Sequence, residues 1–87
     1  MKVVAQPIQM IAWFEENGTP HPIRFRFTNK EQYQTVIKVD KVVTIEKEKL
    51  AGNPMYVFTC QSSIDNILKI YELKYELHTC KWMLYKI

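Results

Sequence analysis

The feature that most constrains the fold of this chain is a strict alternation of apolar and polar residues near its C-terminal end. The run Tyr71-Glu-Leu-Lys-Tyr-Glu-Leu-His78 alternates at all eight positions. A period of two is that of a β-strand with one buried and one solvated face, whereas an amphipathic helix repeats every 3.6 residues. The segment Ile23–Thr28 repeats the pattern, with Arg24 and Arg26 on its polar face. The sequence therefore predicts half-buried strands.

Glycine and proline mark where the strands are interrupted. Gly18 and Gly52 are the only two glycines, and each lies in a stretch that also contains Asn and Pro, a composition typical of turns. Between these turns we expect six strands, near residues 7–14, 23–28, 35–46, 55–61, 68–78 and 81–87. The third would measure about 40 Å if straight, at ~3.3 Å per residue, so a bend at Asp40–Lys41 is expected.

Two local features of the predicted strands have alternatives. Ser63–Tyr71 also fits the i, i+3, i+4, i+7 spacing of a helix with Ser63 as N-cap, so one short helical turn near 63–70 is the alternative to a strand start. A two-residue loop at Thr79–Cys80 would place Leu77 opposite Trp82.

The length of 87 residues suits one domain, residues 1–87, because two domains would each be too small to sustain a core. Short strands with short connections predict an all-β fold, a six-stranded antiparallel meander. Closing it into a small, partly open barrel or roll limits the exposed strand edges.

Charge and cysteine content predict little about partners. The formal net charge of +3 is spread evenly, with no basic arm or acidic tail. Cys60 and Cys80 are expected to be reduced thiols, since small secreted domains normally use four or more cysteines. Without a recognisable signal peptide or a run of about 20 apolar residues, we expect a cytoplasmic protein with no membrane partner.

The sequence contains no motif typical of catalysis, of metal binding or of cofactor binding. In the predicted meander Cys60 lies opposite about Ile70, which is about 30 Å from Cys80 and excludes a shared metal or a disulfide. His78 and Cys80 would supply at most two of the four ligands of a zinc site. The carboxylates lie at positions expected on solvated strand faces or in turns, and not in converging pairs. We expect no enzyme activity, no metal and no cofactor, with Cys60 a small core residue.

One strand face has a composition suited to nucleic acid. If Trp13 shares the face of Arg24 and Arg26, an aromatic ring is flanked by two guanidinium groups, the combination that small barrels use to stack bases and hold phosphates. In the alternative interpretation Trp13 packs in the core and the arginines pair with Glu46, Glu72 or Glu76. The sequence favours this alternative, because the net charge supplies no further attraction for phosphates.

A second candidate surface lies on the last strand. Trp82 and Leu84 fall in one phase, and Met83, Tyr85 and Ile87 fall in the other, so both faces are apolar. Either this strand is sandwiched inside the barrel, or its second face meets another chain, including a second copy, through edge pairing.

Several segments resemble those of short uncharacterised proteins of Gram-positive anaerobic bacteria: Trp13-Phe14, Pro22-Ile-Arg-Phe-Arg26, Tyr71-Glu-Leu-Lys-Tyr-Glu76 and Lys81-Trp-Met-Leu-Tyr-Lys-Ile87. The resemblance implies a bacterial cytoplasmic protein and no particular activity. From the residues themselves we expect a non-catalytic interaction module that self-associates through edge strands. The alternative is a weak single-stranded nucleic-acid-binding domain.

Overall fold

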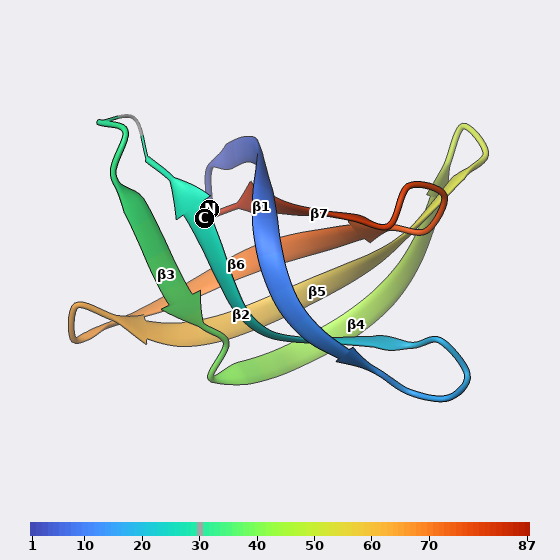
Figure 1. Ribbon diagram of the computed structural model, residues 1–87, viewed down its shortest axis with the longest axis horizontal. Helices are drawn as coiled ribbons and strands as arrows, with labels where there is room; N and C mark the ends of the chain where they lie inside the picture. The colour runs from blue at the N-terminus through green and yellow to red at the C-terminus, as the bar shows by residue number, and fades with distance from the viewer. Residues whose placement is uncertain (30) are drawn as a thin grey trace.

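The computed structural model describes residues 1–29 and 31–87, and the described residues form strands and turns without a helix (Figure 1). Seven strands follow in order: β1 (Val3–Phe14), β2 (Pro20–Thr28), β3 (Gln34–Lys38), β4 (Lys41–Leu50), β5 (Asn53–Ile64), β6 (Ile67–Glu76) and β7 (Lys81–Lys86). The predicted all-β class is confirmed. The predicted strand 35–46 is two strands, β3 and β4, separated where the bend was expected.

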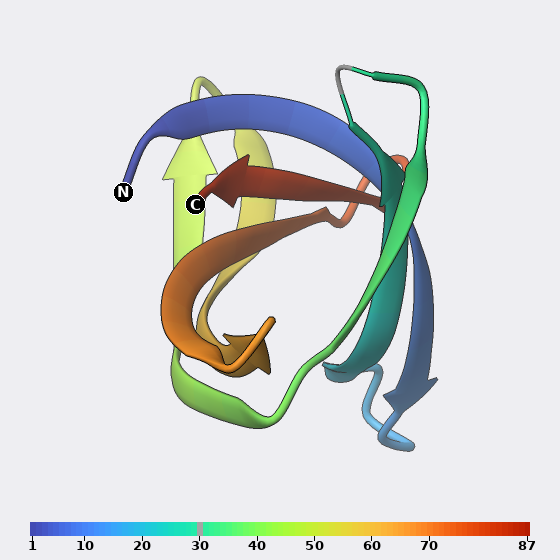
Figure 2. The same ribbon diagram turned by 90° about the vertical axis from the view of Figure 1, so that its left-hand side faces the viewer.

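The strands form one antiparallel sheet in the order β3-β2-β1-β7-β6-β5-β4. Two meanders, β1–β3 and β4–β7, are joined by pairing between β1 and β7, so the prediction of a single six-stranded meander is wrong. Strands β3 and β4 lie at opposite edges of the sheet order, yet only Val39 and Asp40 connect them. The sheet must therefore curl until its edges approach, which gives the partly open barrel seen in Figure 2.

The inner face of the curled sheet holds the core. Its buried members come from five strands: Phe25, Ile37, Phe58, Cys60, Tyr71, Leu73, Tyr75, Trp82 and Leu84. Aromatic rings make up much of it, with the Tyr75 and Trp82 centroids 4.8 Å apart. Cys60 is fully buried, as predicted, and both cysteines are free thiols. Burial of this apolar surface is the main force that holds the sheet curled.

A buried hydroxyl in β5 holds the connection between the two edge strands, β3 and β4. Ser62 in β5 is 1% exposed. Its Oγ donates to the Lys38 carbonyl at 2.7 Å, accepts from the Asp40 amide at 3.3 Å and lies 2.6 Å from the Tyr71 hydroxyl. Asp40 Oδ2 accepts a further bond from the Ser63 amide at 2.8 Å. These contacts fasten the β3–β4 connection onto β5.

The predicted helical turn near 63–70 is absent. Strand β5 continues to Ile64, and a two-residue hairpin loop, Asp65–Asn66, returns the chain into β6. Both loop residues have positive φ, 51° and 63°, as in a type I′ turn, a conformation that Asp and Asn tolerate better than most residues. The apolar spacing that resembled a helix belongs to paired strands, in which Ile64 lies opposite Ile67.

The predicted β6–β7 loop is also wrong. Four residues, Leu77–Cys80, form the connection, and the Cys80 amide bonds the Glu76 carbonyl at 2.8 Å. The register differs from the predicted one by two residues, so Trp82 faces Tyr75 instead of Leu77. A shift of two keeps every side chain on its expected face. The predicted register of β5 and β6 is wrong by one residue, because Cys60 pairs with Tyr71 and not with Ile70, which lies on the other face of β6.

Candidate nucleic-acid interface

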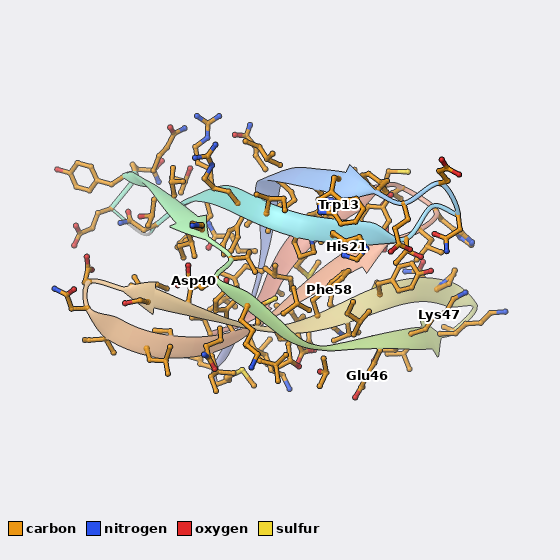
Figure 3. All side chains as sticks on the ribbon, turned by 90° about the horizontal axis from the view of Figure 1, so that it is seen from below. Trp13, His21, Asp40, Glu46, Lys47 and Phe58 are labelled. Atoms are coloured by element: carbon orange, nitrogen blue, oxygen red, sulfur yellow. The ribbon has the colours of Figure 1, made fainter. Side chains whose placement is uncertain are left out.

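Trp13 lies on the outer face of β1 and is 52% exposed, so the interpretation that placed it in the core is wrong. It pairs with His21 of β2, and the two rings stack in parallel, with centroids 4.0 Å apart and planes 9° apart. Figure 3 shows the two side chains next to each other on neighbouring strands. The core-facing positions of β1 hold Ile8, Met10 and Ala12 instead.

Arg24 and Arg26 lie on the same outer face as Trp13. Arg24 pairs with Ile11 and Arg26 with Gln9, and these partners occupy the same phase of β1 as Trp13. Opposite residues of paired strands project from the same side of a sheet. The alternative in which the arginines pair with glutamates across the sheet is also wrong, because no such ion pair occurs within residues 1–29 and 31–87.

The outer face of β1, β2 and β3 carries positive charge. Lys38 of β3 lies opposite Arg24, which adds a third cation. The Arg26 guanidinium donates to the Gln9 side-chain oxygen from Nε at 2.7 Å and also from Nη2. This bond involves no opposite charge, so it orients the guanidinium without neutralising it.

A shallow trough runs along this face. One depression of about 430 Å³ is lined by Gln9, Met10, Ile11, Arg24, Phe25, Arg26 and Val36. A second, of about 240 Å³, is lined by Pro7, Ile8, Gln9, Arg26, Phe27, Thr28 and Gln34. The two share Gln9 and Arg26, so they are successive parts of one trough that passes beside both arginines. Both polar and apolar side chains line the trough, a mixture that ligand-binding depressions commonly have.

His21 was not predicted as part of this face, because the strand expected from the sequence begins at residue 23. It is the second residue of β2, and Pro20 and Pro22 on either side of it are buried. Its Nε2 lies 3.1 Å from Glu15 Oε1, so a carboxylate lies beside the ring that supports Trp13. Gln9, Ile11, Val36 and Lys38 were missed as well. Gln9 and Ile11 share the alternation of Trp13 along β1, whereas only the strand register identifies Val36 and Lys38, and register depends on pairing partners.

The second predicted surface, Met83, Tyr85 and Ile87, does not form one face. Strand β7 is paired on both sides, with β1 and β6, and is therefore not a sheet edge. The register of β6 and β7 shifts between Leu84 and Lys86, so a bulge at Tyr85 reverses the alternation and Ile87 packs against the core. Tyr85 faces Lys74, whose Nζ lies 3.8 Å from the ring centroid and 3.0 Å from Glu48 Oε2.

The edge strands of the sheet, β3 and β4, lack the features that favour pairing with a second copy of the chain. Strand β3 has five residues, and β4 alternates Glu46 and Glu48 on the outer face with Lys47 and Lys49 on the other. If two β4 strands met around a two-fold axis perpendicular to the sheet, each face would meet the same face, and like charges would be brought together. Charged edge strands of this kind oppose edge-to-edge association.

Comparison with known proteins gave no match to any family model, curated protein or solved structure. In the described residues no helix is long and apolar enough to cross a membrane. No cluster of three or more His, Cys, Asp or Glu side chains suited to a metal occurs there either. The resemblance to short bacterial proteins, and the cytoplasmic location that it implies, stay predictions.

Proposed function

We propose that the protein is a non-catalytic binding module whose outer β1–β2–β3 face binds single-stranded nucleic acid. One observation carries the proposal: a half-exposed tryptophan, stacked on a histidine, lies on the same sheet face as Arg24, Arg26 and Lys38, beside a trough. Cations along a trough attract the phosphate backbone, and an exposed aromatic ring stacks unpaired bases.

The magnitudes suit modest affinity. Stacking of a base on an aromatic side chain contributes about 1–3 kcal/mol. Three phosphate contacts on a single strand correspond to a slope of log K against log salt of about −2, at ~0.7 per contact. Binding should therefore be measurable at low salt and weak at physiological salt. This agrees with the small net charge of +3, which is spread evenly along the chain.

Binding is tested with fluorescently labelled dT and rU oligonucleotides, followed by anisotropy over a range of salt concentrations. Replacement of Arg24 and Arg26 together by Ala should weaken binding at low salt at least tenfold and reduce the salt slope by about 1.4, which is two contacts at ~0.7 each. The reason is the loss of two of the three cations beside the trough.

The matched control is Lys69→Ala, which removes a positive charge from exposed Lys69 of β6, a residue that lines neither part of the trough. This variant should keep wild-type affinity to within about twofold. The proposal fails if the wild type binds neither oligonucleotide at low salt, or if Lys69→Ala weakens binding about as much as the double replacement of Arg24 and Arg26.

Association with a protein partner or a second copy receives less support. The predicted surface on β7 is divided between the outer face and the core, and the charges of β4 disfavour self-pairing. Self-association through edge strands stays a prediction.

A further inference from the structure

The tryptophan platform has one ring face available. His21 covers one face of Trp13 in a parallel stack at 4.0 Å, yet Trp13 keeps 52% of its surface exposed. The exposed surface must therefore include much of the opposite ring face. A planar base placed there would extend the Trp13–His21 pair to a three-layer stack, the arrangement in which aromatic side chains hold unpaired bases.

The platform and the trough follow one another along the strands. The pair Trp13 and His21 is followed on the outer face by Ile11 and Arg24, where the trough begins. The trough then continues past Arg26 to Thr28. A strand of nucleic acid that places one base on Trp13 can therefore run its backbone past both guanidinium groups without changing direction.

The distance from Trp13 to the far end of the trough limits the number of nucleotides that fit on this face. From Trp13 to Pro7, the far end of the trough on β1, is six residues, or about 20 Å at ~3.3 Å per residue. A stacked strand advances about 3.4 Å per nucleotide, so about six nucleotides fill this length, and a more extended strand needs fewer.

We propose that the outer face takes a run of about four to six unpaired nucleotides, with the base at one end stacked on Trp13 and the backbone along Arg24 and Arg26. This inference rests on the proposed function. It adds the length of the bound strand, the stacking of its terminal base on Trp13 and a preference for single strands over duplex. A duplex fits poorly, because each of its internal bases is already stacked on both faces and must be flipped out to reach Trp13, at a cost of a few kcal/mol.

A length series tests the proposal with the wild-type protein. Unlabelled dT oligonucleotides of two to twelve nucleotides compete with a labelled dT12. Affinity should rise steeply up to four to six nucleotides and then only slowly, and a 12-base-pair duplex should compete at least tenfold more weakly than dT12. A steady rise through all lengths, or equal competition by the duplex, would overturn the inference.

Abasic substitution locates the stacked base. One abasic site is moved through dT6, and the terminal position that meets Trp13 should lose about five- to hundredfold in affinity, against smaller losses elsewhere. Trp13→Ala should remove this position dependence while keeping the salt slope, and Trp13→Phe should restore much of it. Equal losses at all positions would refute the stacked end.

The outcomes separate the two claims. No binding of any oligonucleotide contradicts the proposed function. Salt-dependent binding without a length plateau or abasic sensitivity leaves the charged trough intact and rejects only the Trp13 end. The length series and the abasic scan use the wild-type protein, so they decide the inference even if Trp13→Ala does not fold.

Discussion

Side chains of one type occupy opposite environments in this protein. Trp13 is 52% exposed, whereas Trp82 is 9% exposed and packs among Phe58 and Tyr75. The cysteines divide in the same way, with Cys60 buried and Cys80 exposed. Residue type alone therefore does not predict which tryptophan or which cysteine is buried. Strand phase assigns Cys60 and Trp82 to the inner face, while Trp13 required the register of β1 with β2.

The two thiols should differ in reactivity. Burial raises the pKa of Cys60 to about 12, so at pH 8 its thiol is protonated as well as covered. An aromatic disulfide reagent should therefore modify one thiol per native chain rapidly, and the second only after denaturation. Cys80→Ser should leave no rapidly reacting thiol. Equal rates for both cysteines would show that the β5 strand opens readily.

At the scale of the elements, the turns are the least regular features. Gly18 and Gly52 have positive φ, as expected of glycines in turns. Within residues 1–29 and 31–87, six residues other than glycine also have positive φ, among them Ala51, Asp65 and Asn66. Asp and Asn adopt this region at low cost, whereas Ala has no side-chain group to compensate. The β4–β5 hairpin loop, Ala51–Gly52, is therefore a strained element.

Replacement of Ala51 by Asn should stabilise the protein. Ala51 has φ of 50° and Gly52 has φ of 78°, the backbone of a type I′ turn, in which Asn-Gly is the preferred pair. We expect the free energy of unfolding to rise by about 0.5–1 kcal/mol, since part of the left-handed strain is relieved. Urea denaturation measures it. Asn at the neighbouring exposed Leu50, whose φ is not positive, is the control and should give no gain.

At the scale of the whole molecule, the curl of the sheet determines which surfaces exist. The edges β3 and β4 approach because two residues connect them (Figure 2). Ser62 fixes that connection to β5. The curl turns Phe25 and Phe58 inward and leaves Arg24 and Arg26 outside. The candidate interface is thus the convex side of a sheet whose concave side is the core.

Loss of the Ser62 hydroxyl should weaken the closure of the barrel. Ser62→Ala leaves the Lys38 carbonyl, the Asp40 amide and the Tyr71 hydroxyl without this partner, so the free energy of unfolding should fall by about 1–3 kcal/mol. The melting temperature should fall by about 4–8 °C per kcal/mol. Ser63→Ala, at an exposed neighbouring position, should change stability by less than about 0.5 kcal/mol. Equal effects of the two substitutions would contradict a role for Ser62 in closure.

The sequence by itself determined the class of the fold and the approximate strand positions. Alternation, β-branched residues and the two glycine turns act within a few residues, so segments such as Ile23–Thr28 and Tyr71–Glu76 were predicted correctly. The arginine face also followed from alternation alone. These features are local, and local sterics and solvation are encoded in neighbouring residues.

Only the tertiary structure decided the pairing of β1 with β7, the position of Trp13 and the division of β7 between the outer face and the core. Each depends on register or on a bulge, such as those beside Ile11 and at Tyr85, and a one-residue change in register moves every later side chain to the other face. Register depends on partners far apart in the chain, and the closure at Ser62 joins residues 22 to 24 positions apart. For that reason the predicted face of Trp13, Arg24 and Arg26 became a defined surface only once the sheet had curled.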